Sequence, residues 1–438
     1  MNFEEALNYM QGLRLFGIKL GNERFLNLLD RLGNPHLKYP VVHIAGTKGK
    51  GSTTALTAAI LKEHGFNVGS YYSPYVFDVR ERVQINGEVI PREDFARLVS
   101  EIKPHADTLA ETELGTTTEF ELKTAVGFLY FAEQNVDFAA IEVGLGGRLD
   151  ATNVVSPVST VITNIGLDHT HILGDTHAKI AFEKAGIIKP GIPCITATDN
   201  QEALEVIRRR AEESGAPLYE VIQGDTSTVP KAIQCRITGY EDDNRPEFSV
   251  TTQRREYSKL RAGLLGSYQI ANAGCAIGAV EEASVQRGFA MDCEVVRRAI
   301  ANTTLPGRMQ IARTNPTLLL DGAHNAIAAE ALRAELCKMK YDQLVLVIGM
   351  VGGHEPAGVV NVLASLASKV FATQPDWHKS IPAEEMAAAV RATNLNVEVV
   401  MPPLEAARRA LSEAGPNDLV VVTGSFYLVG EVNPEKLG

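Results

Sequence analysis

The segment Gly46-Thr47-Lys48-Gly49-Lys50-Gly51-Ser52-Thr53 has the residue types of a phosphate-binding loop. Its glycines let the backbone curl so that successive N–H groups converge on phosphate oxygens, and a helix after the loop adds the partial positive charge of its N-terminus. Lys50 can neutralise the β and γ phosphates, and the hydroxyl of Ser52 or Thr53 can face a magnesium ion. The segment therefore predicts a site for a nucleoside triphosphate.

The match to the common P-loop pattern is imperfect, because Gly51 separates Lys50 from Ser52. A Gly- and Lys-rich surface turn is the alternative interpretation. The flanking residues favour the phosphate loop, since Val41 to Ala45 has the pattern of a buried strand and Thr53 to His64 that of a helix closed by Gly65.

The elements that hold this loop follow a regular alternation. From about residue 39 short apolar runs alternate with longer segments of helical period, which is typical of a doubly wound parallel sheet covered by helices. Further strands are expected at Val68 to Tyr72, Phe138 to Val143, Val158 to Asn164 and Ile192 to Ala197, and further helices at Phe120 to Gln134 and His177 to Ile188.

The pattern changes twice later in the chain. Between about Leu218 and Lys259 polar, Thr-rich and turn-rich runs predict a small antiparallel section at the edge of the first domain, after which a helix resumes near Tyr268. The stretch Asn302 to Gly307 predicts a linker. The α/β alternation then restarts, with strands expected at Thr317 to Asp321, Leu344 to Gly349, Lys369 to Thr373, Val397 to Met401 and Leu419 to Thr423. We expect a first domain over residues 1–301, a linker over 302–308 and a smaller domain over 309–438.

Composition narrows the class of partner. The 438 residues, 45% of them hydrophobic, exceed what one core usually holds. The 42 Lys plus Arg against 53 Asp plus Glu give a net charge of −11, which argues against nucleic-acid binding because that needs a basic face. Five scattered cysteines without CxxC spacing argue against disulfides or zinc, and no apolar run approaches the roughly 18 residues of a membrane span. We expect a cytoplasmic protein with small-molecule partners, no nucleic acid and no membrane.

Further motifs occur in a fixed order along the chain. They are Ser73-Pro74-Tyr75, Arg80 to Val83, Thr118-Glu119-Phe120-Glu121, Glu142 to Asn153, Thr163 to His169, Glu183 to Lys189, Gln269 with Asn272, Pro306-Gly307-Arg308, Asp321 to Asn325 and Thr423-Gly424-Ser425. Together with the Gly-Thr-x-Gly-Lys-Gly-Ser form of the loop, they span nearly the whole chain. On these motifs the chain resembles the folylpolyglutamate synthase and dihydrofolate synthase branch of the Mur ligase family.

The resemblance implies a fold and an activity. The implied fold is α/β: a P-loop, Mur-ligase-like ATPase domain with a mostly parallel sheet and a small antiparallel section, then a smaller Rossmann-like C-terminal domain. The implied activity is ATP-dependent ligation of L-glutamate to a folate-type carboxylate through an acyl phosphate. That activity would be tetrahydrofolate polyglutamylation, conversion of dihydropteroate to dihydrofolate, or both. Mg²⁺ is the implied cofactor, ATP is a substrate, and a monomer is implied.

The resemblance also assigns roles to single residues. The catalytic residues are Lys50, His169, Lys184 and Arg308. ATP is assigned to Thr47, Lys48, Gly49, Lys50, Gly51, Ser52, Asn272, Arg308 and Asp321. The metal is assigned to Ser73, Glu142, His169 and Lys184. The folate is assigned to Thr118, Glu119, Phe120, Glu121, Leu149, Asp150 and Ala151, with a contribution from Phe16 to Lys19. Glutamate and the interdomain contact are assigned to His324 and Ser425.

Residue types alone leave simpler interpretations open. A lone histidine at a strand end, such as His169, is ordinarily a hydrogen-bonded structural residue, Asp321 is placed to cap a helix, and Phe120 has the character of a core residue. Two positions depart from the family pattern: Tyr268 replaces a usual His, and Val351 to Glu355 replaces a usual Lys-Asp pair. The rival functions are another Mur-type ligase acting on a cell-wall precursor and a non-catalytic nucleotide-binding protein.

Lys184 carries the most unusual expectation. By resemblance, carbon dioxide carbamylates its amine and so turns a cation into a carboxylate-like metal ligand. A free lysine, with a pKa of about 10.4, is almost wholly protonated at neutral pH, so the site has to favour the neutral amine by desolvation or by a nearby metal charge. The alternative is a surface lysine paired with an acid such as Glu183.

Overall fold

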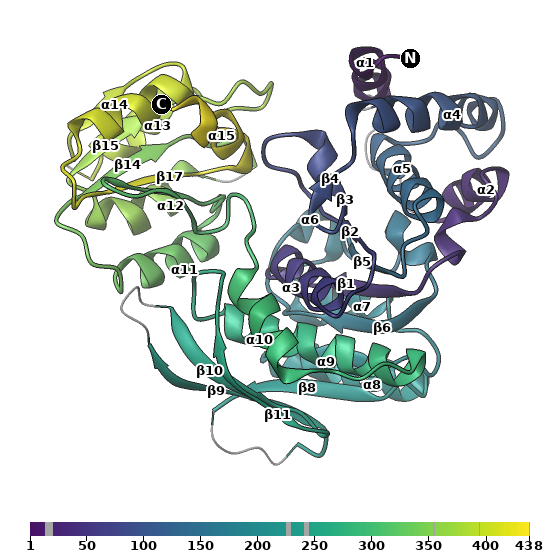
Figure 1. The fold of residues 1–438 in the computed structure, drawn as a ribbon. Helices are drawn as coiled ribbons and strands as arrows, with labels where there is room; N and C mark the ends of the chain where they lie inside the picture. Colours follow the sequence, from purple (N-terminus) through teal and green to yellow (C-terminus); the bar gives the residue numbers. More distant parts are fainter. Residues whose placement is uncertain (14–20, 225–228, 241–244, 354, 394, 438) are drawn as a thin grey trace.

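The computed structural model describes residues 1–438 apart from 14–20, 225–228, 241–244, 354, 394 and 438. The described residues form two β-sheets, each with its own helices, and the chain passes from the first to the second after α10 (Cys293–Asn302). Figure 1 shows the two parts side by side, with the colours from purple to green in the first and from green to yellow in the second.

In the described part of the chain the first sheet has eleven strands, in the order β11-β10-β9-β8-β7-β6-β1-β5-β2-β3-β4. Their bounds are β1 (Val41–Ala45), β2 (Val68–Tyr71), β3 (Val83–Ile85), β4 (Glu88–Val89), β5 (Phe138–Glu142), β6 (Pro157–Ile162), β7 (Cys194–Thr196), β8 (Leu218–Gln223), β9 (Ala232–Tyr240), β10 (Pro246–Thr251) and β11 (Glu256–Arg261). Strand β1 lies between β5 and β6 and is parallel to both. The phosphate loop therefore leaves the sheet at its centre.

Helices cover both faces of this sheet because its central strands are apolar on both sides. In β1, Val41 packs into one core and Val42 and Ile44 into the other, as expected of a strand buried on both faces. The helices of the first core are α1 (Phe3–Leu13), α2 (Glu23–Arg31), α4 (Arg92–Ala110) and α5 (Glu119–Glu133). Those of the second core are α3 (Lys50–Glu63), α9 (Gln269–Arg287) and α10. The helices α6 (Thr170–Leu173), α7 (His177–Ala185) and α8 (Gln201–Glu213) pack beside β6 and β7.

The second sheet has six described strands, in the order β12-β13-β17-β14-β15-β16. Their bounds are β12 (Gln310–Arg313), β13 (Thr317–Leu320), β14 (Leu344–Ile348), β15 (Lys369–Ala372), β16 (Val397–Val399) and β17 (Leu419–Thr423). All are parallel except β12, which pairs antiparallel with β13. The helices of this part are α11 (Ala326–Leu336), α12 (Pro356–Leu363), α13 (Ala383–Arg391), α14 (Pro403–Glu413) and α15 (Phe426–Glu431). Short 3-10 helices lie at Pro35–Leu37, Val79–Arg82, Ala151–Val154, Ala364–Leu366 and Pro434–Lys436.

The predicted fold class, two α/β units with mostly parallel sheets, is confirmed. Every strand and helix named from the sequence forms, with shifted ends: α3 begins three residues earlier than expected, at Lys50, and α7 ends at Ala185 rather than Ile188. None of the helices in the described ranges is long and apolar enough to cross a membrane.

The predicted antiparallel section is wrong at its start. Strand β8 pairs parallel with both β7 and β9. Within this section the antiparallel pairs are β9 with β10 and β10 with β11. The reason is that helix α8 connects β7 to β8, and such a crossover brings the chain back in the same direction. The sequence reading also missed the antiparallel pairs β2-β3 and β3-β4 at the other edge.

Candidate active site

The phosphate loop turns from β1 into α3 through a left-handed glycine. Gly49 precedes the helix with φ 84°, and a β-carbon there would lie 2.4 Å from Oδ1 of Asn272, so both the backbone and the space favour glycine. Asn272 itself is held in the first turn of α9, where its Nδ2 donates to Oε1 of Gln269 at 2.8 Å. The expected ATP residues of the loop and of α9 thus meet.

A second loop, residues 163–169 after β6, holds the phosphate loop in place. The N–H groups of Thr47 and Lys48 donate to the backbone and side-chain oxygens of Asn164, at 2.9 and 2.8 Å. The Thr163 hydroxyl donates to the Lys48 carbonyl at 2.6 Å. These two N–H groups are therefore already hydrogen-bonded within the protein. The shape of the phosphate loop depends on contacts that were not predicted from the sequence.

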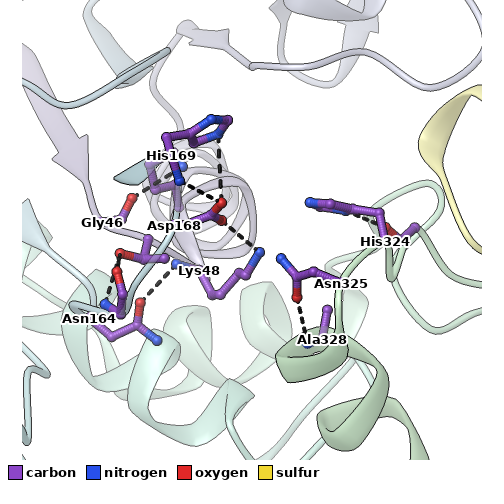
Figure 2. A network of polar contacts seen from close by, with 12 residues as sticks. Gly46, Lys48, Asn164, Asp168, His169, His324, Asn325 and Ala328 are labelled. Atoms are coloured by element: carbon purple, nitrogen blue, oxygen red, sulfur yellow. Dashed lines mark hydrogen bonds and ion pairs between the residues drawn. The ribbon is translucent and has the colours of Figure 1, made fainter. Parts of the chain in front are cut away.

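Asp168 and His169 end this second loop (Figure 2). Lys48 Nζ lies 3.1 Å from Oδ2 of Asp168. Burial raises the pKa of Asp168, but Lys48 outweighs it and the net pKa is lowered. His169 has φ 51°, a strained backbone for a residue that is not glycine, and its side chain is 54% exposed. Partial burial and the charges of three lysines, Lys50, Lys184 and Lys48, lower its pKa against the raising effect of Asp168, so the imidazole is neutral near pH 7.

Glu142 provides a buried carboxylate at the end of β5. It is 2% exposed, Lys50 Nζ lies 4.0 Å from its Oε1, and the Ser73 N–H donates to its Oε2 at 3.1 Å. Burial raises its pKa, against the lowering effects of Lys50 and Arg308. Lys50 also donates to the Gly46 carbonyl at 3.2 Å. Thr53, in the first turn of α3 after Lys50, has a buried Oγ1 with no partner among the described residues.

Lys184 is buried and is not a surface lysine. It is 5% exposed, and its Nζ donates to the Gly46 carbonyl of the phosphate loop at 2.9 Å. Glu183, the acid that the alternative interpretation paired with it, bonds instead to Arg148 at 2.9 Å. Burial, followed by the charge of Lys50, lowers the pKa of Lys184 to about 7. Lys184, Lys50, Asp168 and His169 line one cavity together with Gly46.

The segment between the two sheets brings Arg308 to the cavity that Glu142 lines. Arg308 lines a cavity together with Gly51 and Glu142, and its guanidinium lies 4.7 Å from the ring centre of Phe426. Asp321 does not cap a helix: its carboxylate accepts from the N–H groups of Met309 and Ala323, both at 2.9 Å, while Asn325 caps α11.

His324 and Ser425 lie in different surroundings. Figure 2 shows His324 pointing from the second part of the molecule toward Lys48 and Asp168. Its Nδ1 lies 2.9 Å from the Gly322 carbonyl. Ser425 is 2% exposed and caps α15, accepting from the Leu428 N–H at 3.0 Å and donating to the Gly349 carbonyl at 3.2 Å. The geometry gives Ser425 a structural task at the end of β17.

Two family models match the chain, the Mur ligase middle domain over residues 44–280 and the Mur ligase glutamate ligase domain over residues 307–426. The dihydrofolate synthase/folylpolyglutamate synthase of Bacillus subtilis is 36% identical over 433 residues, 98% of each chain. The chain belongs to this branch of the Mur ligase family. The resemblance stated from the motifs is thereby confirmed.

Solved structures of the family agree over the full length. Escherichia coli FolC in complex with DHPP and ADP has a TM-score of 0.86 and 29% identity, with 99% of this chain and 97% of that chain covered. The bifunctional folylpolyglutamate synthase/dihydrofolate synthase of Yersinia pestis, complexed with AMPPNP and Mn ion, has a TM-score of 0.84 and 27% identity, with the same two coverages.

The first group of residues that the resemblance assigns to folate, Thr118 to Glu121, lies at the N-terminus of α5. Thr118 and Glu121 form a capping box at its N-terminus, and Arg24 of α2 holds Glu121 with two hydrogen bonds of 3.0 and 2.8 Å. Glu119 pairs with Lys123 at 2.6 Å. Arg24 was missed from the sequence, where nothing local links it to a residue 97 positions away. Phe16 to Lys19 lie outside the described residues.

The two folate-side motifs converge at Gly144. A β-carbon on Gly144 would lie 2.3 Å from Cζ of Phe120 and 3.1 Å from Oδ2 of Asp150. Phe120 therefore approaches Asp150 across a glycine, although it also packs against the first core. Asp150 is 5% exposed and Ala151 is 8% exposed, while Leu149 is partly buried. Two of the residues that the resemblance assigns to folate, Phe120 and Asp150, therefore meet at Gly144.

The metal residues assigned by the family do not form one ready-made cluster. Among the described residues, no group of three His, Cys, Asp or Glu side chains is arranged to hold a metal. Glu142 nevertheless fits a hard cation, because its carboxylate is buried, with Lys50 Nζ as far as 4.0 Å away and the Ser73 N–H as a backbone donor. His169 and Lys184 line a common cavity, and Lys184 can contribute a ligand there only after its charge is removed.

Proposed function

We propose that this member of the family joins L-glutamate to the carboxylate of a folate-type substrate, with ATP consumed through an acyl phosphate. One observation carries the proposal: Lys50 of the phosphate loop lies 4.0 Å from the buried Glu142 carboxylate, and Arg308 of the segment between the sheets lines a cavity with the same residue. The site thus has one cation from the first part of the molecule and one from the segment between the sheets. The full-length similarity to dihydrofolate synthase/folylpolyglutamate synthase adds support.

The reaction needs an activated carboxylate. An oxygen of the substrate carboxylate attacks the γ phosphorus of ATP, the bond from phosphorus to the β–γ bridging oxygen breaks, and ADP leaves. The amine of glutamate then attacks the carbonyl carbon of the acyl phosphate, phosphate leaves, and the amine loses its proton to the surroundings. Such phosphoryl transfer depends mainly on positioning and on charge stabilisation.

The chain's own cations would supply much of that stabilisation. Lys50 is placed to neutralise the β and γ phosphates, and Arg308 to neutralise charge that develops on the transferred phosphoryl group. Asp321 holds the backbone just after Arg308 through the Met309 N–H, and so fixes where Arg308 enters the site. Asn272, beside Gly49, would face the adenine end of the nucleotide.

A divalent cation belongs to this chemistry, and we propose that it is Mg²⁺. When bound, it supplies charge neutralisation at the phosphates. Glu142 and Ser73 would hold it at one side, and His169 with Lys184 would hold a second ion. Relatives with ADP, and with AMPPNP and Mn ion, support the use of nucleotide and divalent metal.

We propose that Lys184 is carbamylated. Its burial and the pKa of about 7 meet the requirement that a fraction of the amine be neutral at physiological pH. A carbamate also exchanges a buried positive charge next to Lys50 for a negative one. The buried position supports this proposal over the surface ion pair with Glu183.

The remaining assignments complete the proposal. Folate would lie against the segment Thr118 to Glu121 and against Leu149, Asp150 and Ala151, while glutamate would enter near His324. Ser425 would act through the position of α15. We further propose that the chain acts as a monomer, with domain limits at residues 301 and 309.

The two rival functions are less well supported. Another Mur-type ligase acting on a cell-wall precursor would share the ATP chemistry, but the Bacillus subtilis relative that matches over 98% of the chain is a dihydrofolate synthase/folylpolyglutamate synthase. A non-catalytic nucleotide-binding protein would not need Glu142, His169 and Lys184 at the loop.

The test is product formation. The protein is incubated with ATP, Mg²⁺ and glutamate, with either dihydropteroate or tetrahydrofolate, and the products are identified by mass. We expect a mass gain of one or more glutamyl units with at least one substrate, and phosphate release that requires both the folate and the metal. Vigorous ATP hydrolysis without a folate substrate would contradict the proposal.

A further inference from the structure

A chain of buried side chains links the centre of the first sheet to Asp150 on the folate side. His43 lies in the middle of β1 with 0% exposure, and its Nε2 lies 2.9 Å from Oγ1 of Thr152. Thr152, also 0% exposed, donates its hydroxyl proton to Oδ1 of Asp150 at 2.6 Å. The family resemblance assigned a role to Asp150 but none to His43 or Thr152.

The number of available protons determines which group donates in each of these hydrogen bonds. Each oxygen of the Asp150 carboxylate accepts a backbone N–H: Oδ1 accepts from Thr152 at 3.0 Å, and Oδ2 accepts from Leu145 at 2.8 Å. A carboxylate that accepts on both oxygens is the ionised form, so the single Thr152 hydroxyl proton points to it. Thr152 then offers only a lone pair to His43, and Nε2 of His43 carries the proton between them.

The electrostatics agree with this assignment. Burial, then the charge of Lys189, lowers the pKa of His43 to about 3, so the ring is neutral near pH 7. Burial raises the pKa of Asp150 overall, and the hydrogen bonds from Thr152, Leu145 and Gly144 oppose that rise. Thr152 thus contributes both a hydroxyl and a backbone donor to keep the carboxylate ionised.

His43 is an unfavourable choice for packing alone. The other side chains of β1, Val41, Val42, Ile44 and Ala45, are apolar and buried. Nδ1 of His43 is buried with no partner among the described residues. A hydrophobic residue would fill this place without leaving a buried acceptor unpaired, so the histidine is better explained by what its Nε2 proton does.

The consequence for the site is an oriented carboxylate. Two hydrogen bonds from Thr152 occupy Oδ1, whereas Oδ2 accepts the Leu145 N–H and lies 3.1 Å from the place of a β-carbon on Gly144, beside the Phe120 ring. We infer that His43 and Thr152 are positioning residues for the folate-type substrate: they hold Asp150 so that Oδ2 meets an N–H donor of the substrate's heterocycle beside Phe120. This inference rests on the proposed function.

Two matched pairs of variants test it. Thr152→Val removes the hydroxyl and keeps the shape, and Thr152→Ser restores the hydroxyl. His43→Leu removes the donor, and His43→Gln restores an N–H at a similar reach. For each variant, the KM values for dihydropteroate, ATP and glutamate are measured together with kcat.

We expect Thr152→Val to raise the KM for dihydropteroate about tenfold, the effect of losing one hydrogen bond to a charged group, with the KM for ATP within about twofold of wild type. Thr152→Ser should recover most of that loss. His43→Leu should raise the same KM by a smaller factor, and His43→Gln should reverse it.

Equal effects of the Val and Ser variants, or parallel rises in the KM for ATP, would overturn the inference in favour of a packing role. If Thr152→Val does not fold, His43→Leu and His43→Gln test the inference by the same comparison of the KM for dihydropteroate with the KM for ATP. Binding of dihydropteroate in the presence of AMPPNP is also measured by calorimetry for the wild type and the four variants. This measurement separates a failure of the proposed ligase function from a failure of the inference about His43 and Thr152. A wild type that binds dihydropteroate but makes no product refutes the ligase function only. A wild type that makes product while all variants bind dihydropteroate equally refutes the inference only.

Discussion

At the scale of single residues, the two lysines of the phosphate loop have different surroundings. Lys50 is 17% exposed beside Glu142, whereas Lys48 is 34% exposed and already paired with Asp168. Because removal of one group that stabilises transition-state charge typically costs about 10²–10³-fold in kcat, we expect that loss for Lys50→Ala. Lys48→Ala should lose about tenfold or less, chiefly through the loop's shape. Steady-state kinetics compare the two, and equal losses would contradict the assignment.

Lys184 makes a chemical prediction. If its carbamate is a ligand, Lys184→Ala should lose most of its activity, and acetate or another short carboxylate should restore part of it by filling the space left next to Gly46. Glu183→Ala is the matched control, since that carboxylate bonds to Arg148 and should be dispensable for turnover. Native mass spectrometry of the wild type should show one extra carboxyl group, and a mass equal to that of the sequence would refute the modification.

The pKa of Lys184 gives this modification a pH dependence. The amine is neutral above about pH 7 and protonated below it, and only the neutral amine takes up carbon dioxide. Protein depleted of carbon dioxide should therefore regain activity with bicarbonate quickly at pH 8 and poorly at pH 6. The same lowered pKa means that the unfolded chain binds more protons between about pH 7 and 10.4, so this group's contribution to stability rises with pH in that window. Reactivation that is equally fast at both pH values would count against the neutral-amine requirement.

At the scale of elements, the strands, the helices and the phosphate loop could be predicted from local sequence patterns. The run at 41–45 and the glycines at 46, 49 and 51 define β1 and its turn without tertiary information. The direction of β8 was not predictable from its own residues, because polar and apolar side chains mix in it and the α8 crossover decides the pairing. Partners far apart in the chain, such as Arg24 with Glu121 and Lys48 with Asn164, carry no local signal at all.

The turn after β5 makes the sharpest prediction at this scale. Gly144→Ala would place a β-carbon 2.3 Å from Phe120 Cζ, so the ring must move away from Asp150. We expect the KM for the folate substrate to rise tenfold or more, with the KM for ATP little changed, since the phosphate loop lies at a different turn. Gly239→Ala is the control, because nothing lies within 4 Å of the added atom there. A Gly144→Ala enzyme with an unchanged folate KM would show that Phe120 is plain core.

At the scale of the whole molecule, the site is shared between two α/β parts. The Ser267 hydroxyl donates to Oε1 of Glu335 at 2.8 Å, across the boundary between the segment before α9 and α11. Gly307, which precedes Arg308, packs against Val76 and Val429. The residues that the family resemblance assigns to ATP come from the first part, the segment between the sheets and the second part. Relative movement of the parts is therefore the natural way to complete the site.

We expect the two parts to close on ATP. Lys50 belongs to the first part, Arg308 to the segment between the sheets and Asp321 to the second part, so a nucleotide bound between them would contact both sides. Closure would exclude water from the acyl phosphate. Small-angle scattering should show a smaller radius of gyration with AMPPNP, Mg²⁺ and dihydropteroate than without ligands. Lys50→Ala, which weakens the phosphate contact, should close less at the same ligand concentration. Because a loss of binding would mimic a loss of closure, calorimetry has to confirm that each protein is saturated. Curves that coincide for free and saturated wild type would refute closure.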